Sequence, residues 1–224
     1  MTSFQQMPLV LKPPRKPSFK NFVVSGNGAV VSTLQSAPQA PGWTVVLGPK
    51  GCGKSHLATA LFNQASADGP EAAFVSLSDP TRWPLLENAK AAVWVLDDID
   101  ALAGDHGGEM LLFNALNRWH ADQSTVVMTA HAFSAFVLPD LVSRLAQATR
   151  LLVKPLDEVG FEAMAQQLVA DQDMQLSSEV AHYLVTRMPR NGHALTQTVH
   201  ALMAQALAER RVITKPMVKA LLDA

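Results

Sequence analysis

Apolar positions along the first two thirds of the chain form short continuous runs that alternate with stretches of helical spacing. The runs predict five strands, at residues 45–47, 73–77, 93–96, 125–129 and 150–153. Helical stretches near residues 55–66, 81–90 and 108–121 separate the first four strands. A short strand at residues 22–24 and part of a helix at residues 29–34 are expected ahead of them. Strands that alternate with helices favour an α/β fold, in which helices cover both faces of a parallel sheet.

The pattern changes after Pro155, where apolar residues recur at helical spacing and no strand candidate follows. Four helices are predicted, at residues 157–170, 177–187, 191–208 and 215–222. We therefore expect an α/β domain over residues 19–154 and a small all-α domain over residues 155–224. Residues 1–18 are rich in proline and basic residues, a composition that predicts an extended or mobile segment.

Residues 48–55 fit the phosphate-binding pattern G-x-x-x-x-G-K-[ST], between an apolar run and a helical stretch. Glycines in such a loop let successive backbone N–H groups face phosphate oxygens at a helix N-terminus. The charge of Lys54 would reach the β- and γ-phosphates, and the Ser55 hydroxyl would ligate Mg²⁺. The sequence therefore predicts a nucleoside phosphate bound by the following residues: Gly48, Pro49, Lys50, Gly51, Cys52, Gly53, Lys54 and Ser55.

A second acidic element follows the apolar run at residues 92–96. Asp97 comes at the end of that strand, where a carboxylate can hold Mg²⁺ through its water shell. Asp98 would orient the water that attacks a γ-phosphate, whereas Asp100 is expected to be a solvated loop acid. An acidic turn without a catalytic role is the alternative interpretation of this segment.

Composition excludes several other classes of protein. The net charge is −1 and charged residues make up 17% of the chain, so nothing indicates a surface that coats nucleic acid. Cys52 is the single cysteine, which excludes an internal disulfide and fits a reducing cytoplasm. We expect its thiol to be a small filler of the loop rather than a redox switch. The sequence contains no apolar run of 18 residues, so a cytoplasmic protein without a membrane span is expected.

Further segments carry a resemblance to a known family. They are residues 21–24 with Asn27, residues 48–56, residues 97–99 with 103–105, residues 138–145 (Leu-Pro-Asp-Leu-Val-Ser-Arg-Leu) and residues 155–157. Over about residues 19–224, the chain resembles the DnaA-type AAA+ ATPases, and within them the regulatory inactivators of DnaA, the Hda family. The resemblance implies an AAA+ sheet domain followed by a helical lid, with ADP or ATP and Mg²⁺ as ligands. It also implies that the protein, together with the sliding clamp, promotes ATP hydrolysis on a DnaA-type initiator and so prevents re-initiation.

The resemblance assigns roles to single residues. Val23 would lie against the adenine, and His56 would follow the loop serine as in the family. Arg144 would act in trans, reaching the γ-phosphate of a nucleotide held by a neighbouring protein; a surface or intradomain salt bridge is the alternative. His193 stands where the family has a lid arginine, and His131 where many members have an acid. Because a neutral imidazole does not replace an obligate charge near phosphates, we expect slow intrinsic hydrolysis, although either histidine could be an ordinary helix-start or loop residue.

The N-terminal segment resembles the clamp-binding peptide of the inactivators in a compressed form. The candidate partner-binding residues are Gln5, Met7, Pro8 and Leu9. A glutamine amide and two apolar side chains on an extended segment suit an apolar pocket with hydrogen-bonding groups, and a tail without any partner is the alternative. The sequence ends at Ala224 without a basic helix-turn-helix module, so no direct sequence-specific DNA binding is expected. The resemblance also allows self-association.

Two other functions remain open at this point. The first is a stand-alone AAA+ ATPase of the helicase-loader type, which would use Asp98 on its own ATP. The second is a nucleotide-sensing adaptor without a catalytic role. GTP is the least expected ligand, because the sequence has no Asn-Lys-x-Asp guanine-reading motif.

Overall fold

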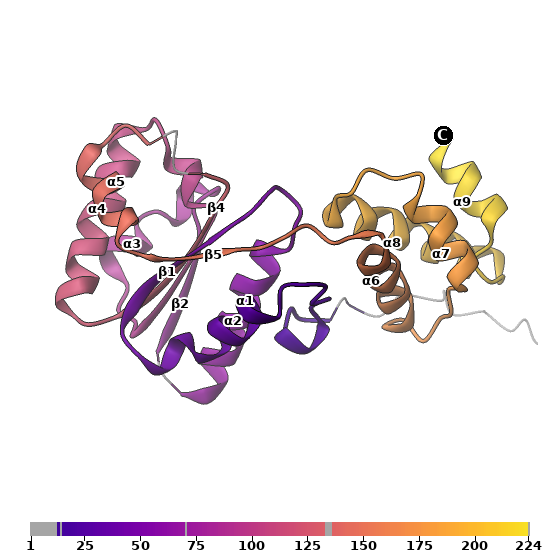
Figure 1. Cartoon of the computed structure of the whole chain (residues 1–224), viewed down its shortest axis with the longest axis horizontal. Coiled ribbons are helices and arrows are strands. Elements are labelled where there is room, and N and C mark those ends of the chain that lie inside the picture. Colours follow the sequence, from indigo (N-terminus) through magenta and orange to yellow (C-terminus); the bar gives the residue numbers. More distant parts are fainter. Residues whose placement is uncertain (1–12, 14, 70, 133–135, 224) are drawn as a thin grey trace, which may run out of the picture. The chain divides into compact units, whose positions relative to one another are not determined.

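The computed structural model of the chain describes residues 13, 15–69, 71–132 and 136–223 (Figure 1). They form two compact units, Lys16–Pro155 and Leu156–Ala224, and the described residues before Lys16 group with the second unit. Within the described residues, no helix combines the length and the apolar character needed to cross a membrane.

The first unit is built on a five-stranded, fully parallel sheet with the strand order β2-β3-β4-β1-β5. The strands are β1 (Gly42–Leu47), β2 (Ala72–Ser76), β3 (Val93–Asp97), β4 (Thr125–Ala130) and β5 (Thr149–Leu152). The five predicted strands are confirmed to within a few residues. Every residue of β3 and β4 is buried, whereas the edge strand β5 exposes all but one of its residues, which explains why the central runs are the most apolar.

Side chains that alternate along the strands divide the core into two layers. Val93 and Val95 of β3 face the layer formed with α1 (Gly28–Ser36) and α2 (Lys54–Asp68). Trp94 and Leu96 face the opposite layer, which is completed by α3 (Leu85–Asn88), α4 (His106–Ala121) and α5 (Pro139–Ala146). In that layer Trp94 stacks on Trp119 of α4 with ring centroids 4.2 Å apart. Helices therefore cover both faces of the sheet, as the alternation of elements predicts (Figure 1).

The second unit consists of α6 (Glu158–Ala170), α7 (Ser178–Val185), α8 (Gly192–Glu209) and α9 (Lys215–Leu222) around one apolar core. All four predicted helices are confirmed. Side chains cap three of them: Asp157 at α6, Ser177 at α7 and Asn191 at α8.

The structure differs from the sequence-based expectations in three places. Residues 22–24 do not form the predicted strand, because the Val24 carbonyl accepts from Asn27 N in a tight turn through Ser25 and Gly26. The helix predicted near residues 81–90 is a 3₁₀ turn (Pro80–Arg82) followed by the short α3. Helix α5 was not predicted as a helix at all. Its proline occupies the first helical position, where a missing N–H costs nothing, so the residue that suggests a break marks a helix start instead.

Candidate nucleotide-binding site

The loop at residues 48–53 connects the C-terminal end of β1 to the N-terminus of α2. Gly51 and Gly53 have φ angles of +78° and +98°, a region that favours glycine. A Cβ on Gly53 would lie 2.8 Å from the ring of Phe22, and one on Gly48 would lie 2.7 Å from the backbone oxygen of Val153. The surrounding chain by itself therefore favours glycine at positions 48 and 53.

Lys54 and Ser55 begin α2. The Lys54 side chain is buried, and its Nζ donates to the backbone oxygens of Gly48 (2.9 Å) and Pro49 (3.1 Å). Ser55 is exposed in the first turn, as are Pro49 and Lys50 in the loop. Cys52 is buried in the core beneath the loop, and this burial is the main cause of the raised pKa of its thiol, which agrees with the expected filler role.

The first two acids of the second motif lie against the neighbouring strand β4. Asp97 is buried at the end of β3, and its Oδ1 accepts from the Thr129 hydroxyl at 2.6 Å. Asp98 follows with a left-handed φ of +56°, and its backbone N–H donates to the same hydroxyl at 2.8 Å. Thr129 is fully buried, so one hydroxyl holds both acids. Thr129 is not among the site residues predicted from the sequence; the available signal was a polar residue inside an otherwise apolar strand.

The two motifs meet at the same edge of the sheet. Burial raises the pKa of the half-buried Asp98 carboxyl most, and the nearby charges of Asp97 and Asp100 raise it further. Lys54 and His131 act on the same pKa in the opposite direction, so the loop lysine, the acids and His131 lie within electrostatic reach of one another. These residues lie close together because the strands are parallel and their carboxyl ends lie at one edge of the sheet.

Asp100 is not the solvated loop acid that the sequence suggested. It is half-buried, and its Oδ2 accepts from the backbone N–H of His131 at 3.2 Å. Its Oδ1 is buried without a hydrogen-bond partner among the described residues. The residue belongs to the acidic cluster because the 3₁₀ turn Ile99–Leu102 folds it back toward the end of β4.

The segment before α1 lies beside the loop. The Phe22 ring lies 5.6 Å from the His56 ring, and Val23 is half-buried. His56 Nε2 lies 3.0 Å from the Ser18 oxygen, and burial lowers the pKa of this imidazole. Asn27 is buried and pairs with the backbone of Lys154 in both directions, at 2.8 and 3.0 Å. The entry segment is therefore attached to the loop helix and to the chain just beyond β5.

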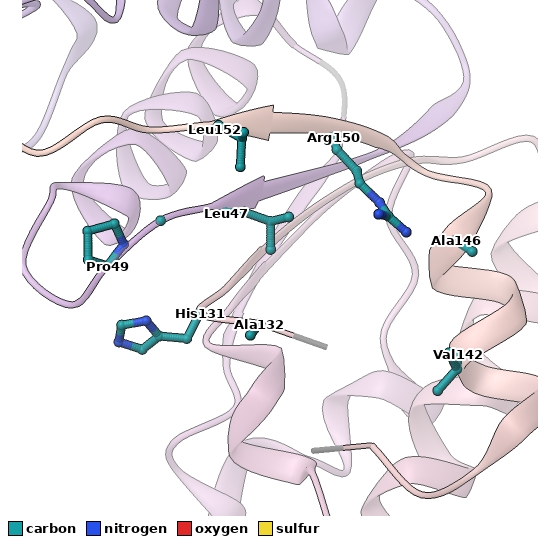
Figure 2. Close-up of a pocket in the computed structure, with 9 residues that line it drawn as sticks. Leu47, Pro49, His131, Ala132, Val142, Ala146, Arg150 and Leu152 are labelled. Atoms are coloured by element: carbon teal, nitrogen blue, oxygen red, sulfur yellow. The ribbon is translucent and has the colours of Figure 1, made fainter. Parts of the chain in front are cut away.

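An open hollow of about 730 Å³ borders this edge of the sheet (Figure 2). Its lining residues are Leu47, Gly48, Pro49, His131, Ala132, Val142, Ala146, Arg150 and Leu152. Pro49 and His131 come from the ends of β1 and β4, whereas Val142 and Ala146 come from α5 (Figure 2). Lys54 and Ser55 are not among the lining residues, so the hollow is a neighbour of the phosphate loop and not its interior.

Comparison with protein families identifies both units. Residues 44–154 match the model of the ATPase family associated with various cellular activities (AAA), and residues 157–222 match the model of the Hda lid domain. The chain is a DnaA-type member of the AAA+ family, similar to Hda. A protein of Haemophilus influenzae whose function is uncharacterised is 28% identical over 228 residues, covering 98% of this chain and 99% of the relative.

Solved structures support the same fold. Domain III of the Thermotoga maritima replication initiation protein DnaA superposes with a TM-score of 0.80 at 19% identity, over 95% of this chain and 98% of that domain. AMPPCP-bound DnaA from Aquifex aeolicus superposes with a TM-score of 0.70 at 19% identity, over 86% of this chain and 65% of that chain. The Thermotoga maritima RuvB Holliday junction branch-migration motor superposes with a TM-score of 0.71 at 16% identity, over 93% of this chain and 72% of that chain. The fold class predicted from the sequence, an AAA+ sheet domain followed by a helical lid, is therefore confirmed.

Arg144 lies in the last turn of α5, whose buried face consists of Leu141 and Leu145. The arginine side chain is half-buried, and its guanidinium has no hydrogen-bond or ion-pair partner within the described residues. The salt bridge considered as the alternative role of Arg144 is therefore not found in the described part of the chain.

The remaining predicted site residues belong to the second unit or lie outside the described residues. His193 is exposed in the first turn of α8 in the second unit, and its backbone N–H donates to the Asn191 cap at 2.9 Å. Gln5, Met7, Pro8 and Leu9 lie outside the described residues.

Proposed function

We propose that this chain is a cytoplasmic regulatory protein that binds ADP or ATP with Mg²⁺ and acts on a DnaA-type initiator. Together with the sliding clamp, it would promote hydrolysis of the initiator's ATP and so prevent re-initiation. The observation that carries the proposal is the phosphate-binding loop of Gly48–Ser55, beside the Asp97–Asp98 pair, in a chain with an Hda-type lid.

The residues at the loop fit a nucleotide with a magnesium ion. The close approaches at Gly48 and Gly53 leave no room for side chains, so the loop presents backbone to a ligand. Lys54 holds its buried charge on two loop carbonyls, which are weaker partners for an ammonium group than phosphate oxygens. The Ser55 hydroxyl and the Asp97 carboxylate are hard oxygen donors of the kind that Mg²⁺ prefers, and a bound Mg²⁺ would neutralise phosphate charge. DnaA of Aquifex aeolicus, which shares the fold, was solved with bound AMPPCP.

The guanidinium of Arg144, which has no partner among the described residues, supports a role in trans. A planar, permanently charged group can stabilise the charge that spreads over phosphate oxygens during transfer. In GTPases, an arginine of this kind accelerates hydrolysis by about 10³–10⁵-fold. Since α5 packs through Leu141 and Leu145, Arg144 is left available to a neighbouring protein.

Intrinsic hydrolysis by this chain should be slow. His131 and His193 stand where the resemblance implies charged groups, and both are exposed. We expect turnover by the isolated protein to stay well below about 1 s⁻¹, the lower end of typical enzymes. Robust turnover that is lost in Asp98→Asn would instead support a stand-alone ATPase.

Nucleotide binding is tested by calorimetry with ADP and Mg²⁺. Lys54→Ala should weaken binding by at least about tenfold, the effect of losing about 1.4 kcal/mol from a charge-assisted contact. Lys90→Ala, which removes an exposed lysine of the same unit, is the matched control and should bind as the wild type does. Equal ADP affinity in folded Lys54→Ala and wild-type protein would refute the nucleotide assignment.

The regulatory role is tested with purified initiator, clamp on DNA and this protein. Arg144→Ala should keep clamp binding and lose stimulation of initiator hydrolysis, because only the transition-state charge is removed. Deletion of residues 1–12 should lose clamp binding and stimulation while ADP binding persists, because a tether raises local concentration. Arg82→Ala, a surface arginine paired with Asp79, is the control and should stimulate normally. Stimulation that does not depend on Arg144 would favour the adaptor function, and clamp binding by the truncated protein would refute the role of residues 5–9.

A further inference from the structure

A buried carboxylate lies between the acidic motif and the helix that carries Arg144. Glu109 of α4 has no exposed surface and forms no ion pair within the described part of the chain. Its Oε1 accepts from the backbone N–H groups of Gly104 (2.8 Å) and Val137 (3.0 Å). Its Oε2 accepts from Leu138 N (2.7 Å) and also lies 3.1 Å from Val137 N. One side chain therefore satisfies three backbone donors from two different loops.

The two loops belong to the two functional elements. Gly104, with a φ of +84°, follows the 3₁₀ turn that begins directly after Asp98. Val137 and Leu138 immediately precede α5, and Leu138 is its N-cap residue. The Glu109 carboxylate thus connects the loop behind the acidic motif to the start of the Arg144 helix.

The base of this connection is rigid. Glu109 N donates to the Asp105 oxygen at 2.9 Å, and the Asp105 side chain caps the helix through Gly107 N at 3.2 Å. A Cβ on the neighbouring Gly108 would lie 2.9 Å from the Leu102 side chain, so α4 begins in close contact with the loop before it. The start of α4 thus fixes the position of Glu109, and the Glu109 carboxylate in turn accepts hydrogen bonds from the two loops.

The charge at this position has a cost that an apolar side chain would avoid. An ionised carboxylate without an ion pair loses hydration when it is buried, and hydrogen bonds must replace that loss. Burial raises the pKa of Glu109, whereas the N–H groups of Gly104, Val137 and Leu138 and the nearby charge of His106 lower it, and the net shift is downward. Glu109 is therefore held as a carboxylate, the form that accepts from all three donors.

We propose that Glu109 is a positioning residue for Arg144, because its carboxylate joins the start of α5 to the loop behind Asp98. Leu141 and Leu145 fix which face of α5 is buried, whereas the hydrogen bonds to Val137 and Leu138 fix where the helix begins. The functional part of this inference rests on the role proposed above for Arg144.

The first test is Glu109→Gln, with Glu87→Gln on the exposed side of α3 as the matched control. A glutamine has one acceptor oxygen, and its NH₂ group would face a backbone donor, so either Gly104 or Leu138 loses its partner. We expect faster amide exchange at residues 104 and 136–146, ADP affinity within about twofold of wild type, and at least about tenfold weaker stimulation of the initiator. The double variant with Arg144→Ala should be no worse than Arg144→Ala alone, because both changes remove the same contribution.

A second variant keeps the carboxylate and removes one donor. Leu138 has a φ of −80°, which suits proline, so Leu138→Pro deletes the N–H that approaches Oε2. The change also removes the packing of the Leu138 side chain against the core, and Leu138→Ala, which keeps the N–H, is the control for that loss. Leu138→Pro should also weaken stimulation while ADP binding persists, and it replaces the first test if Glu109→Gln fails to fold. Wild-type exchange at residues 136–146, or wild-type stimulation by either folded variant while Arg144→Ala is inactive, would overturn the proposal. If Arg144→Ala itself stimulates normally, the proposed function fails, and amide exchange still decides whether Glu109 holds the start of α5.

Discussion

The Thr129 hydroxyl offers a direct measure of how the two strands hold the acidic motif. Replacing Thr129 by valine keeps the shape of the side chain and removes the donor to Asp97 Oδ1 and the acceptor of Asp98 N–H. A hydrogen bond to a charged group contributes about 1.5–3 kcal/mol, and a buried N–H without a partner costs about 1–3 kcal/mol. Because such terms are not fully additive, we expect Thr129→Val to lower the free energy of unfolding by roughly 3 kcal/mol.

The same change should affect the ligand through Asp97. With Thr129 in place, one oxygen of Asp97 is engaged by the hydroxyl, which orients the carboxylate. Loss of a group that orients a metal ligand typically weakens metal affinity by about 10–100-fold. The gain in ADP affinity that Mg²⁺ provides should therefore shrink by about that factor, whereas affinity without Mg²⁺ should change little.

Urea denaturation without nucleotide measures the stability, and ADP titrations with and without Mg²⁺ measure the ligand effect. Thr129→Ser keeps the hydroxyl and is the control, and it should retain most of the stability and the whole Mg²⁺ effect. The reasoning fails if Thr129→Val loses less than about 0.5 kcal/mol, the range of neutral surface substitutions, and binds Mg²⁺-ADP as the serine variant does.

Three further outcomes are expected. Gly48→Ala should lower the free energy of unfolding by about 1–3 kcal/mol in urea denaturation and remove most of the ADP affinity in calorimetry, because its Cβ would lie 2.7 Å from the Val153 backbone oxygen. An unchanged stability and affinity would contradict the tight loop geometry. Asn27→Ala should lower the free energy of unfolding, measured in the same urea denaturation, by about 2 kcal/mol, because two hydrogen bonds to the Lys154 backbone disappear from a buried site. An unchanged free energy of unfolding would argue against this pairing. The Glu109 pKa is lowered from its ordinary 4.5, so its contribution to stability is complete above that value and is lost as the pH falls through the folded-state pKa. Unfolding free energies measured from pH 6 to pH 3 should therefore fall less steeply in Glu109→Gln than in wild type, and parallel curves would contradict this assignment.

The hydrophobic pattern by itself determined most of the architecture of this protein. Fully buried parallel strands are continuous apolar runs, so β3 and β4 were located from those runs alone. The four lid helices were located from the helical spacing of their apolar residues. The loop at residues 48–55 was equally visible, because its glycines and Lys54 are close together in the chain and belong to one local geometry.

Only the tertiary structure decided what lies between these elements. Thr129 and Glu109 act through atoms that are 32 and 28–29 residues away along the chain, and no local pattern records such hydrogen bonds. Asp100 was misjudged for the same reason: a charged residue after a strand is normally solvated, but here a 3₁₀ turn brings it to the end of β4. Local propensity and periodicity depend on neighbours in sequence, whereas the burial and pairing of a polar group depend on which strands the sheet places side by side.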